Sequence, residues 1–193
     1  DETGSQPLSG ATFKLTGNGI ERTGVSDENG RVYFDDLPYG TYTIAETQAP
    51  AGYAPAEAIT VTIDDSNTYR PDGVVAVSEP IKNAHTKLTV LKWNDNGTVP
   101  LPGATFRIRN AAGQYVLATG ADGAYTYTGL TDDSDSASRF VTAGSGAFTL
   151  AYIPMGQYTL EEIEAPDGYI ILTASVNFGI QEAETSVSLS LIH

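Results

Sequence analysis

The stretch GTYTIAETQAPAGY at residues 40–53 decides the fold of this chain, because it returns as GQYTLEEIEAPDGY at residues 156–169. A second pair of similar segments precedes these two. PLSGATFKL occupies residues 7–15, and PLPGATFRI occupies residues 100–108. Unrelated segments would not repeat two motifs in the same order, so the pattern indicates two copies of one domain.

The composition predicts that both copies are β-structures. We place the first domain at residues 1–84 and the second at residues 85–193, and each is long enough to bury its own core. Hydrophobic residues make up 40% of the chain, which is typical of a globular protein. Thr, Tyr, Val and Gly are frequent, and helix-forming residues show no 3.6-residue period. We therefore predict an all-β fold of two tandem immunoglobulin-like β-sandwiches.

Short alternating segments between turn signals give the expected strands. The two motif pairs are 93 and 116 positions apart, so the second domain carries an insertion between Arg107 and Gly146, which we place around residues 116–145. Within it, residues 131–140 read as a surface loop. In the first domain we expect strands at residues 11–15, 31–34, 41–46, 58–63 and 74–83. In the second we expect them at 87–93, 104–108, 125–129, 146–153, 157–162, 174–180 and 186–192.

The charge and the residue inventory exclude several classes of function. A net charge of −14 argues against binding to nucleic acids or anionic membranes. The chain has no cysteine and no membrane-spanning run, and His85 and His193 have no clustered partners. Asp132, Asp133 and Asp135 lack the spacing of a calcium loop and read as a solvated loop. No catalytic motif is present, so we expect neither an enzyme nor a cofactor or metal.

Three charged residues nevertheless follow the apolar phase of their strands. Glu46 and Glu162 occupy the same place in the repeated stretch, whereas Glu161 has the opposite phase and should face solvent. Lys92 is in phase with the apolar residues of segment 87–93. From the residues alone, the favoured interpretation is that Lys92 extends from the strand end to water and that the glutamates lie on the surface.

The order PLxGATF, a D-x-N-G type turn and GxYxLxExxAPxGY resembles the Cna protein B-type (SpaA-like, prealbumin-like) domains of Gram-positive surface adhesins and pilins. The resemblance covers both halves of the chain. Many members of that family join a lysine on the first strand to an asparagine on the last by an isopeptide bond. A glutamate of the YxLxE phrase assists. The resemblance implies that Glu46 and Glu162 are the assisting acids, Lys92 is the nucleophile and Asn83 is an acceptor.

Burial explains how such a bond forms without an enzyme. An apolar core disfavours the charged form of an amine and of a carboxyl group, so the amine can attack and the acid can donate a proton. Neither copy holds all three residues. We expect the lysine of the first domain, with part of its first strand, to precede Asp1. The acceptor of the second domain either follows His193 or is replaced by it, because Asn177 is out of phase with the core.

The resemblance implies a structural role. We expect two stalk domains of an extracellular, cell-wall-anchored adhesin or pilin, stabilised by isopeptide bonds and joined to further domains of the same polypeptide. The alternative is a binding module that recognises a host protein or glycan through the insertion, because loops on rigid sandwiches often carry recognition. An Asp- and Ser-rich loop is a weak binding surface, so we rank this alternative second.

Overall fold

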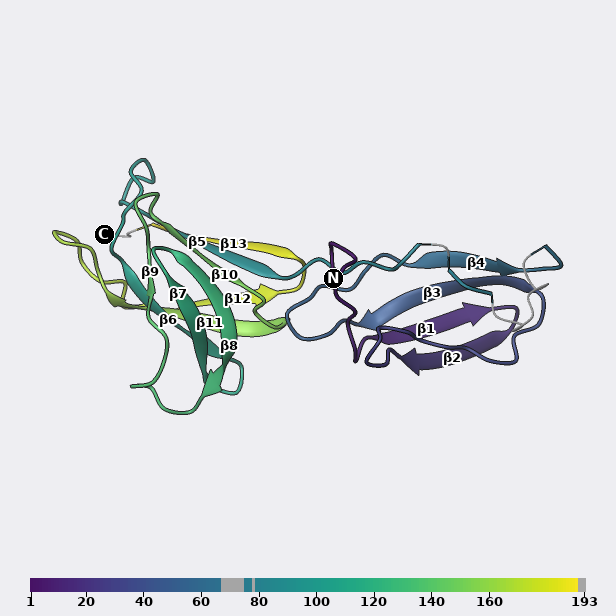
Figure 1. Ribbon diagram of the computed structural model, residues 1–193. Helices are drawn as coiled ribbons and strands as arrows, with labels where there is room; N and C mark the ends of the chain where they lie inside the picture. Colours follow the sequence, from purple (N-terminus) through teal and green to yellow (C-terminus); the bar gives the residue numbers. More distant parts are fainter. Residues whose placement is uncertain (67–74, 78, 191–193) are drawn as a thin grey trace. The chain divides into compact units, whose positions relative to one another are not determined.

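The computed structural model describes residues 1–66, 75–77 and 79–190 (Figure 1). Within these ranges all regular structure is β, and the predicted all-β fold is confirmed. No helix of the described part is long and apolar enough to cross a membrane. The chain forms two compact units. The first unit comprises Asp1–Pro50 and Ala54–Ala84, and the second comprises Ala51–Tyr53 and His85–His193.

The first unit contains one antiparallel sheet of order β2-β1-β3-β4. The strands are β1 (Thr12–Gly17), β2 (Ile20–Val25), β3 (Gly40–Gln48) and β4 (Ile59–Ile63). Asn18 and Gly19 join β1 to β2 with positive φ angles of 52° and 74°, the conformation that an Asn-Gly hairpin turn favours. Alternate residues of β1 and β3 face inward, and the buried core is Ala11, Phe13, Leu15, Tyr42 and Ile44.

The second unit contains a nine-stranded sheet of order β12-β11-β6-β7-β8-β10-β5-β13, with β9 paired to β6. In this sheet β5 lies between β10, which is antiparallel to it, and β13, which is parallel. The core is larger than that of the first unit and includes Leu88, Phe106, Phe140, Phe148 and Leu150. The strands are β5 (Lys87–Trp93), β6 (Thr105–Asn110), β7 (Tyr115–Ala121), β8 (Ala124–Thr131), β9 (Phe140–Val141), β10 (Ala147–Ala151), β11 (Gly156–Glu164), β12 (Val176–Ile180) and β13 (Glu184–Ser190).

The register locates the insertion of the second unit. Phe106 pairs with Phe140 in the same way that Phe13 pairs with Gly24 in the first unit, so β9 resumes the course of β2. The additional residues between them fold mostly as the β7–β8 hairpin, whose inward side chains join the core. Sequence reasoning missed β7 and expected an exposed loop from residue 131 onward, whereas Phe140 is fully buried.

Two predicted strands of the first unit are wrong. Residues 31–34 and the described residues of 74–83 lie outside any sheet; Val74 and Ser78 lie outside the described residues. In the second unit, residues 147–150 correspond to 31–34 and form part of β10, which pairs with β5. The described part of the first unit has no strand in the place of β5. A segment with strand-like sequence then has no neighbour to which its backbone can bond.

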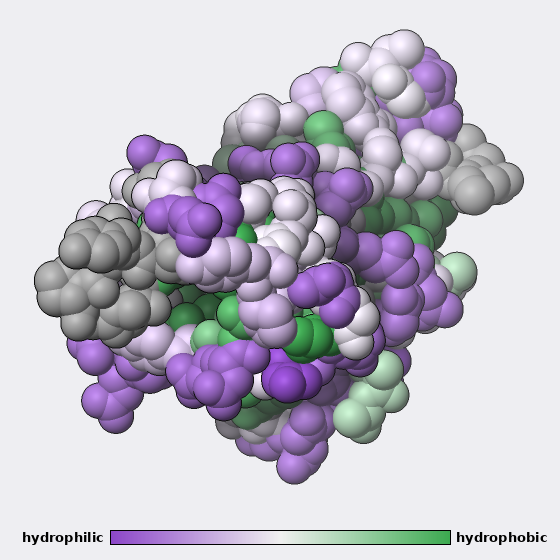
Figure 2. Space-filling view, turned by 90° about the vertical axis from the view of Figure 1, so that its right-hand side faces the viewer, coloured by the Kyte–Doolittle hydropathy of each residue, from purple (hydrophilic) through white to green (hydrophobic). Residues whose placement is uncertain are grey.

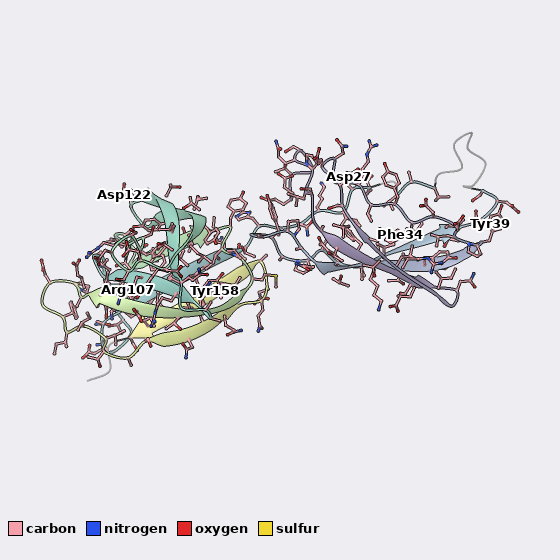
Figure 3. The ribbon with its side chains drawn as sticks, turned by 90° about the horizontal axis from the view of Figure 1, so that it is seen from below. Asp27, Phe34, Tyr39, Arg107, Asp122 and Tyr158 are labelled. Atoms are coloured by element: carbon pink, nitrogen blue, oxygen red, sulfur yellow. The ribbon has the colours of Figure 1, made fainter. Side chains whose placement is uncertain are left out.

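A tyrosine fixes the entry to the repeated stretch in both units. The hydroxyl of Tyr42 donates to the carbonyl of Pro38 over 2.8 Å, and that of Tyr158 donates to the carbonyl of Pro154 over the same distance. Figure 3 labels Tyr158 among the side chains of the second unit. Both rings are buried, so each hydroxyl needs a partner inside the protein. The LPYG and IPMG segments that precede the two stretches are therefore held in the same conformation.

A buried hydroxyl fixes the PLxGATF motif in each unit. Ser26 in the first unit and Thr142 in the second donate to the carbonyl of the motif's leucine over 2.8 Å. Each also accepts the backbone N–H of the motif's first alanine over 3.0 Å. Sequence reasoning did not single out either residue, because a hydroxyl in a loop has no periodic signature.

Candidate functional site

In the second unit, Lys92 and Glu162 meet in the core. Strand alternation turns Lys92 of β5 and Glu162 of β11 toward the interior, and both side chains are fully buried. The distance from Lys92 Nζ to Glu162 Oε2 is 3.0 Å. Glu162 Oε2 also accepts the backbone N–H of Leu172 over 2.7 Å, whereas Glu162 Oε1 is buried without a hydrogen-bond partner.

In the first unit, Glu46 occupies the corresponding place and meets an amide. Asn83 Nδ2 donates to Glu46 Oε2 over 2.5 Å and to the carbonyl of Ala54 over 2.9 Å. Glu46 Oε2 also accepts the backbone N–H of Ala56 over 2.7 Å, and Glu46 Oε1 is buried without a partner. Glu46 and Asn83 are both buried.

The glutamates of the two sites have the same hydrogen-bonding arrangement. In each, a backbone N–H that lies ten residues after the glutamate binds Oε2 and orients the carboxyl group. In each, the second oxygen, Oε1, is buried without a hydrogen-bond partner. A buried polar oxygen without a partner costs free energy, and both units carry this cost at the same position. One copy offers this carboxyl group a lysine amine, and the other offers it an asparagine amide.

The described residues do not bring an acceptor to Lys92. The parallel register of β5 and β13 places Leu189 opposite Lys92, and a leucine cannot form an amide. Asn177 lies on the exposed side of β12, where its Oδ1 accepts the hydroxyl of Thr159 over 2.9 Å. This orientation agrees with its out-of-phase position in the sequence. His193, the alternative occupant of the acceptor position, lies outside the described residues.

On the outer face of the same sheet, Glu161 is the centre of an ion-pair cluster that sequence reasoning missed. Arg107 Nε lies 2.8 Å from Glu161 Oε2, and Arg109 contacts the other oxygen. The guanidinium group of Arg107 also lies 5.1 Å from the centre of the Tyr115 ring. Glu161 thus points away from the core, as its phase predicted, but it is mostly covered by the two arginines. The cluster links β11 to β6 and β7.

Residues of the acidic loop donate hydrogen bonds to one of its carboxylates, that of Asp133. Asp133 accepts the hydroxyl of Ser136 and the backbone N–H of Asp135, and these hydrogen bonds lower the pKa of Asp133 from its ordinary value. Across residues 1–66, 75–77 and 79–190, no group of three or more His, Cys, Asp or Glu side chains could hold a metal ion. Figure 2 shows one face of the molecule, on which hydrophilic and hydrophobic side chains are interspersed.

The fold and these sites define a class of β-domain that keeps a buried glutamate beside a lysine or an asparagine. A family model described as SpaA, a prealbumin-like fold domain, matches residues 1–73 and 86–192. The chain belongs to this family, and the resemblance found in its motifs is confirmed.

Solved structures of pilins have a related fold. Shaft pilin SpaA from Lactobacillus rhamnosus GG is 21% identical with a TM-score of 0.50, and the match covers 99% of this chain and 91% of the pilin. GBS52, the minor pilin of Streptococcus agalactiae, is 20% identical (TM-score 0.43; 96% and 83% covered). The Bacillus anthracis TIE protein is 24% identical (TM-score 0.46), and the chain spans 31% of its length. At these identities the similarity concerns the fold alone. Comparison with curated proteins gives no match.

Proposed function

We propose that this chain is a stalk segment of a Gram-positive surface protein, and that Lys–Asn isopeptide bonds assisted by Glu46 and Glu162 stabilise its domains. One observation carries the proposal. Two units with the same fold present the same oriented carboxyl group, one to a buried lysine and the other to a buried asparagine. A buried ion pair is a weak source of stability, so its retention in a core favours a chemical role.

The bond forms in one balanced step sequence. The neutral lysine Nζ attacks the Cγ atom of the asparagine side chain, and the glutamic acid donates a proton to the amide oxygen. The C–Nδ2 bond then breaks, and ammonia leaves with a proton that came from the amine. The products are an amide bond and free ammonia, and no oxidant or cofactor is needed. Packing holds the amine and the amide in contact. This proximity raises the rate of the reaction, so no separate catalyst is needed.

The strand arrangement gives the bond a mechanical purpose. In the second unit, the first strand β5 and the last strand β13 are parallel neighbours, so a cross-link between them would tie the two ends of the domain together. A pulling force would then act on a covalent bond instead of the hydrogen bonds of the sheet. By analogy with a disulfide that closes a loop of similar length, the chain-entropy gain is about 4–5 kcal/mol.

The surface location and the partners follow from this role. A stalk segment lies outside the cell, is anchored to the cell wall through its parent polypeptide, and is joined to further domains of that polypeptide. The proposal contains no turnover reaction, since each domain would react once. Recognition of a host protein or glycan remains an untested prediction: much of the insertion contributes to the core, and the loop that follows β8 bonds partly to itself.

Intact-mass measurement tests the cross-link. The parent polypeptide, cut to include about ten of its own residues on each side of the chain, supplies the length of one further strand at either end. We expect the mass to fall by about 17 Da, the mass of ammonia, for each bond formed. The variants Glu46→Ala and Glu162→Ala should each prevent one bond, so the measured mass should be about 17 Da higher than that of the wild type after allowance for the substitution. A wild-type mass equal to that of the unmodified sequence would rule out the cross-link.

A further inference from the structure

The chain contains three Asn-Gly dipeptides, and all three lie in exposed turns. They are Asn18-Gly19, Asn29-Gly30 and Asn96-Gly97. At such a dipeptide the backbone nitrogen of the glycine can attack the side-chain carbonyl carbon of the asparagine, because glycine has no side chain to hinder the approach. The three sites have the same reacting groups, so the backbone around each of them decides which one reacts.

The hydrogen bonds of the attacking nitrogen differ between the three sites. The N–H of Gly30 donates to the carbonyl of Asp27 over 2.9 Å, and the N–H of Gly97 donates to the carbonyl of Asn94 over 3.0 Å. The N–H of Gly19, by contrast, donates to no backbone carbonyl of residues 1–66, 75–77 or 79–190. An amide nitrogen must give up its proton before it attacks, and a hydrogen bond to a carbonyl stabilises the protonated form. Of the three nitrogens, that of Gly19 is therefore the least protected.

The space around the turns differs as well. A Cβ atom added to Gly30 would lie 3.1 Å from the backbone nitrogen of Leu8 and from the Cβ atom of Pro7, so this turn packs against a neighbouring segment. Apart from its chain neighbours, no atom of the described residues lies within 4 Å of a Cβ atom added to Gly19. Ring closure moves the backbone of a turn. The turn between β1 and β2 can follow this movement without displacing another segment.

We infer that Asn18 deamidates spontaneously through a cyclic imide formed with Gly19. The Gly19 nitrogen attacks Cγ of Asn18, the Cγ–Nδ2 bond breaks, and ammonia leaves with the proton that the nitrogen gave up. Water then opens the ring. Cleavage between Cγ and the nitrogen yields aspartate, and cleavage between the backbone carbonyl carbon and the nitrogen yields isoaspartate. In either product an amide is replaced by a carboxylate, so the chain gains one negative charge.

This reaction differs from the proposed cross-link in its nucleophile and in its place. Asn83 is buried, its Nδ2 donates to Glu46 and to the carbonyl of Ala54, and its attacker would be a lysine amine. Asn18 is exposed and reacts with its own backbone, with water as the co-reactant. The inference therefore does not rest on the cross-link. Mass distinguishes the two reactions, because the cross-link keeps a loss of about 17 Da, whereas the opened ring is about 1 Da heavier than asparagine.

Deamidation should loosen the tip of the β1–β2 hairpin. Asn18 Nδ2 donates to the carbonyl of Tyr39 over 3.1 Å and so ties the tip to the residue that precedes β3. A carboxylate has no proton to donate, so it would place an oxygen next to that carbonyl oxygen. In the isoaspartate product the main chain also contains one additional carbon, which a two-residue hairpin turn does not accommodate.

Peptide mapping of the chain 1–193 tests the inference. Trypsin cleaves after lysine and arginine, so it places the three asparagines in separate peptides, residues 15–22, 23–31 and 93–107. After incubation of the folded chain at mildly alkaline pH, we expect the form that is heavier by about 1 Da to accumulate about tenfold faster at Asn18 than at Asn29 or Asn96. Equal rates at the three sites, or a faster rate at either of the other two, would overturn the inference.

The same measurement in urea separates the effect of the fold from that of the local sequence. In the unfolded chain the hydrogen bonds of Gly30 and Gly97 are absent, so all three glycine nitrogens are free to react. The three rates should then become similar. A preference for Asn18 as large in urea as in the folded chain would show that the turn hydrogen bonds do not select the site, and it would overturn the structural argument.

The variant Asn18→Asp tests the effect on the hairpin. We expect the methyl NMR signal of Ile20 to shift, because Ile20 follows the turn directly and packs against the core. Asn29→Asp is the matched control. It adds the same charge to the other exposed Asn-Gly turn of the first unit and leaves the hydrogen bond to Tyr39 in place. No shift in Asn18→Asp, or equal shifts in both variants, would overturn the inferred effect on the hairpin.

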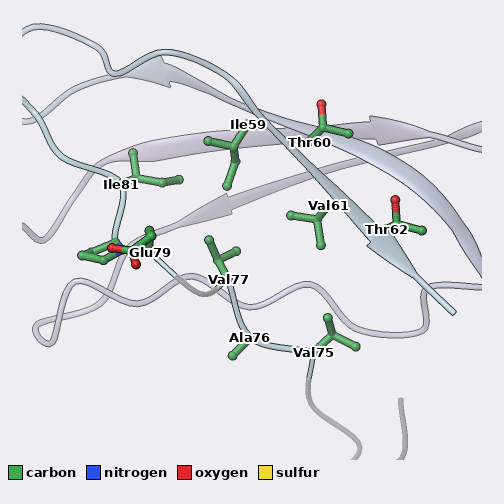
Figure 4. Close-up of a pocket in the computed structure, with 10 residues that line it drawn as sticks. Ile59, Thr60, Val61, Thr62, Val75, Ala76, Val77, Glu79 and Ile81 are labelled. Carbon is green, nitrogen blue, oxygen red and sulfur yellow. The ribbon is translucent and has the colours of Figure 1, made fainter. Parts of the chain in front are cut away.

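Ile59 is the reference within the same unit. It pairs with Ile44, four residues beyond the start of β3 at Gly40, and its side chain lines an apolar groove (Figure 4). Its methyl signal should stay in place in both variants, because the hairpin tip lies beside the start of β3. A shift of Ile59 as large as that of Ile20 would show a general loosening of the unit and would contradict an effect confined to the tip.

Discussion

The amine of Lys92 lies 3.0 Å from a carboxylate oxygen of Glu162, and both side chains are fully buried. Each residue offsets part of the free-energy cost of burying the other. Lys87, on the same strand, provides a matched comparison, because it forms a pair of 2.9 Å with Glu184 at the surface. The chain therefore contains a buried and an exposed ion pair that begin on one strand, β5.

Removal of one member of the buried pair should destabilise the second unit strongly. Glu162→Ala leaves an uncompensated buried amine and should lower the free energy of unfolding by about 3–5 kcal/mol. Lys87→Ala should cost less than about 1 kcal/mol, because an exposed pair is screened by water. Urea unfolding followed by fluorescence of Trp93, the single tryptophan, measures the second unit. Similar costs for the two variants would show that burial of the pair has no energetic consequence.

The double variant Lys92→Met/Glu162→Leu checks the same reasoning in the opposite direction. It replaces both charges by apolar groups of similar size, so neither partner is left without compensation. We expect it to be more stable than either single variant and to form no isopeptide bond. A double variant less stable than Glu162→Ala would indicate that the site tolerates no apolar replacement.

Alkaline pH should destabilise the second unit through Tyr158. Burial, with a smaller contribution from Tyr127, raises the pKa of Tyr158 to about 12. A folded-state pKa above the unfolded value of about 10 means that the stabilisation is complete below pH 10 and is lost as the pH rises through 12. The free energy of unfolding, measured by Trp93 fluorescence, should fall across this interval.

The variant Tyr158→Phe is the control for the pH effect. It should cost about 1 kcal/mol at neutral pH, since it removes the hydrogen bond to Pro154. It should also flatten the decline between pH 10 and pH 12. A decline as steep as that of the wild type would assign the alkaline sensitivity to other groups.

The Thr142 hydroxyl should contribute measurably to the free energy of unfolding, because it makes two buried hydrogen bonds. Thr142→Val keeps the volume but leaves a buried carbonyl and a buried N–H of the PLxGATF motif without partners. We expect a loss of about 1–3 kcal/mol in the free energy of unfolding. Thr142→Ser retains the hydroxyl and should lose less than half as much. Equal losses would mean that the methyl group, and not the hydrogen bonds, carries the effect.

Phe140 tests whether β9, the strand that follows the inserted hairpin, belongs to the core. Its ring is fully buried and stacks on Phe148 with centroids 5.4 Å apart. Phe140→Ala should destabilise the second unit by about 3–5 kcal/mol. Asp135→Ala, in the exposed loop five residues earlier, should change stability by less than about 0.5 kcal/mol. A small effect of Phe140→Ala would contradict the placement of β9 in the core.

The sequence predicted the fold class and the phase of the site residues. Repeated motifs indicated two domains, and alternation assigned Glu46, Glu162 and Lys92 to the inner faces of their strands, where the structure has them. Such signals are local, because strand alternation and turn residues are contained in a few neighbouring positions. The same local signals also predicted strands at 31–34 and 74–83, which the described residues do not form.

Only the tertiary structure decided which strands have neighbours. A strand requires a partner that is distant in sequence, and in the first unit no described strand takes the place of β5. Pairing also placed Leu189 opposite Lys92 and Phe140 of β9 in the core. The sequence by itself determined which side chains face inward, since that depends on alternation. The tertiary structure determined what those side chains meet, because contacts across a sandwich join residues that no local pattern connects.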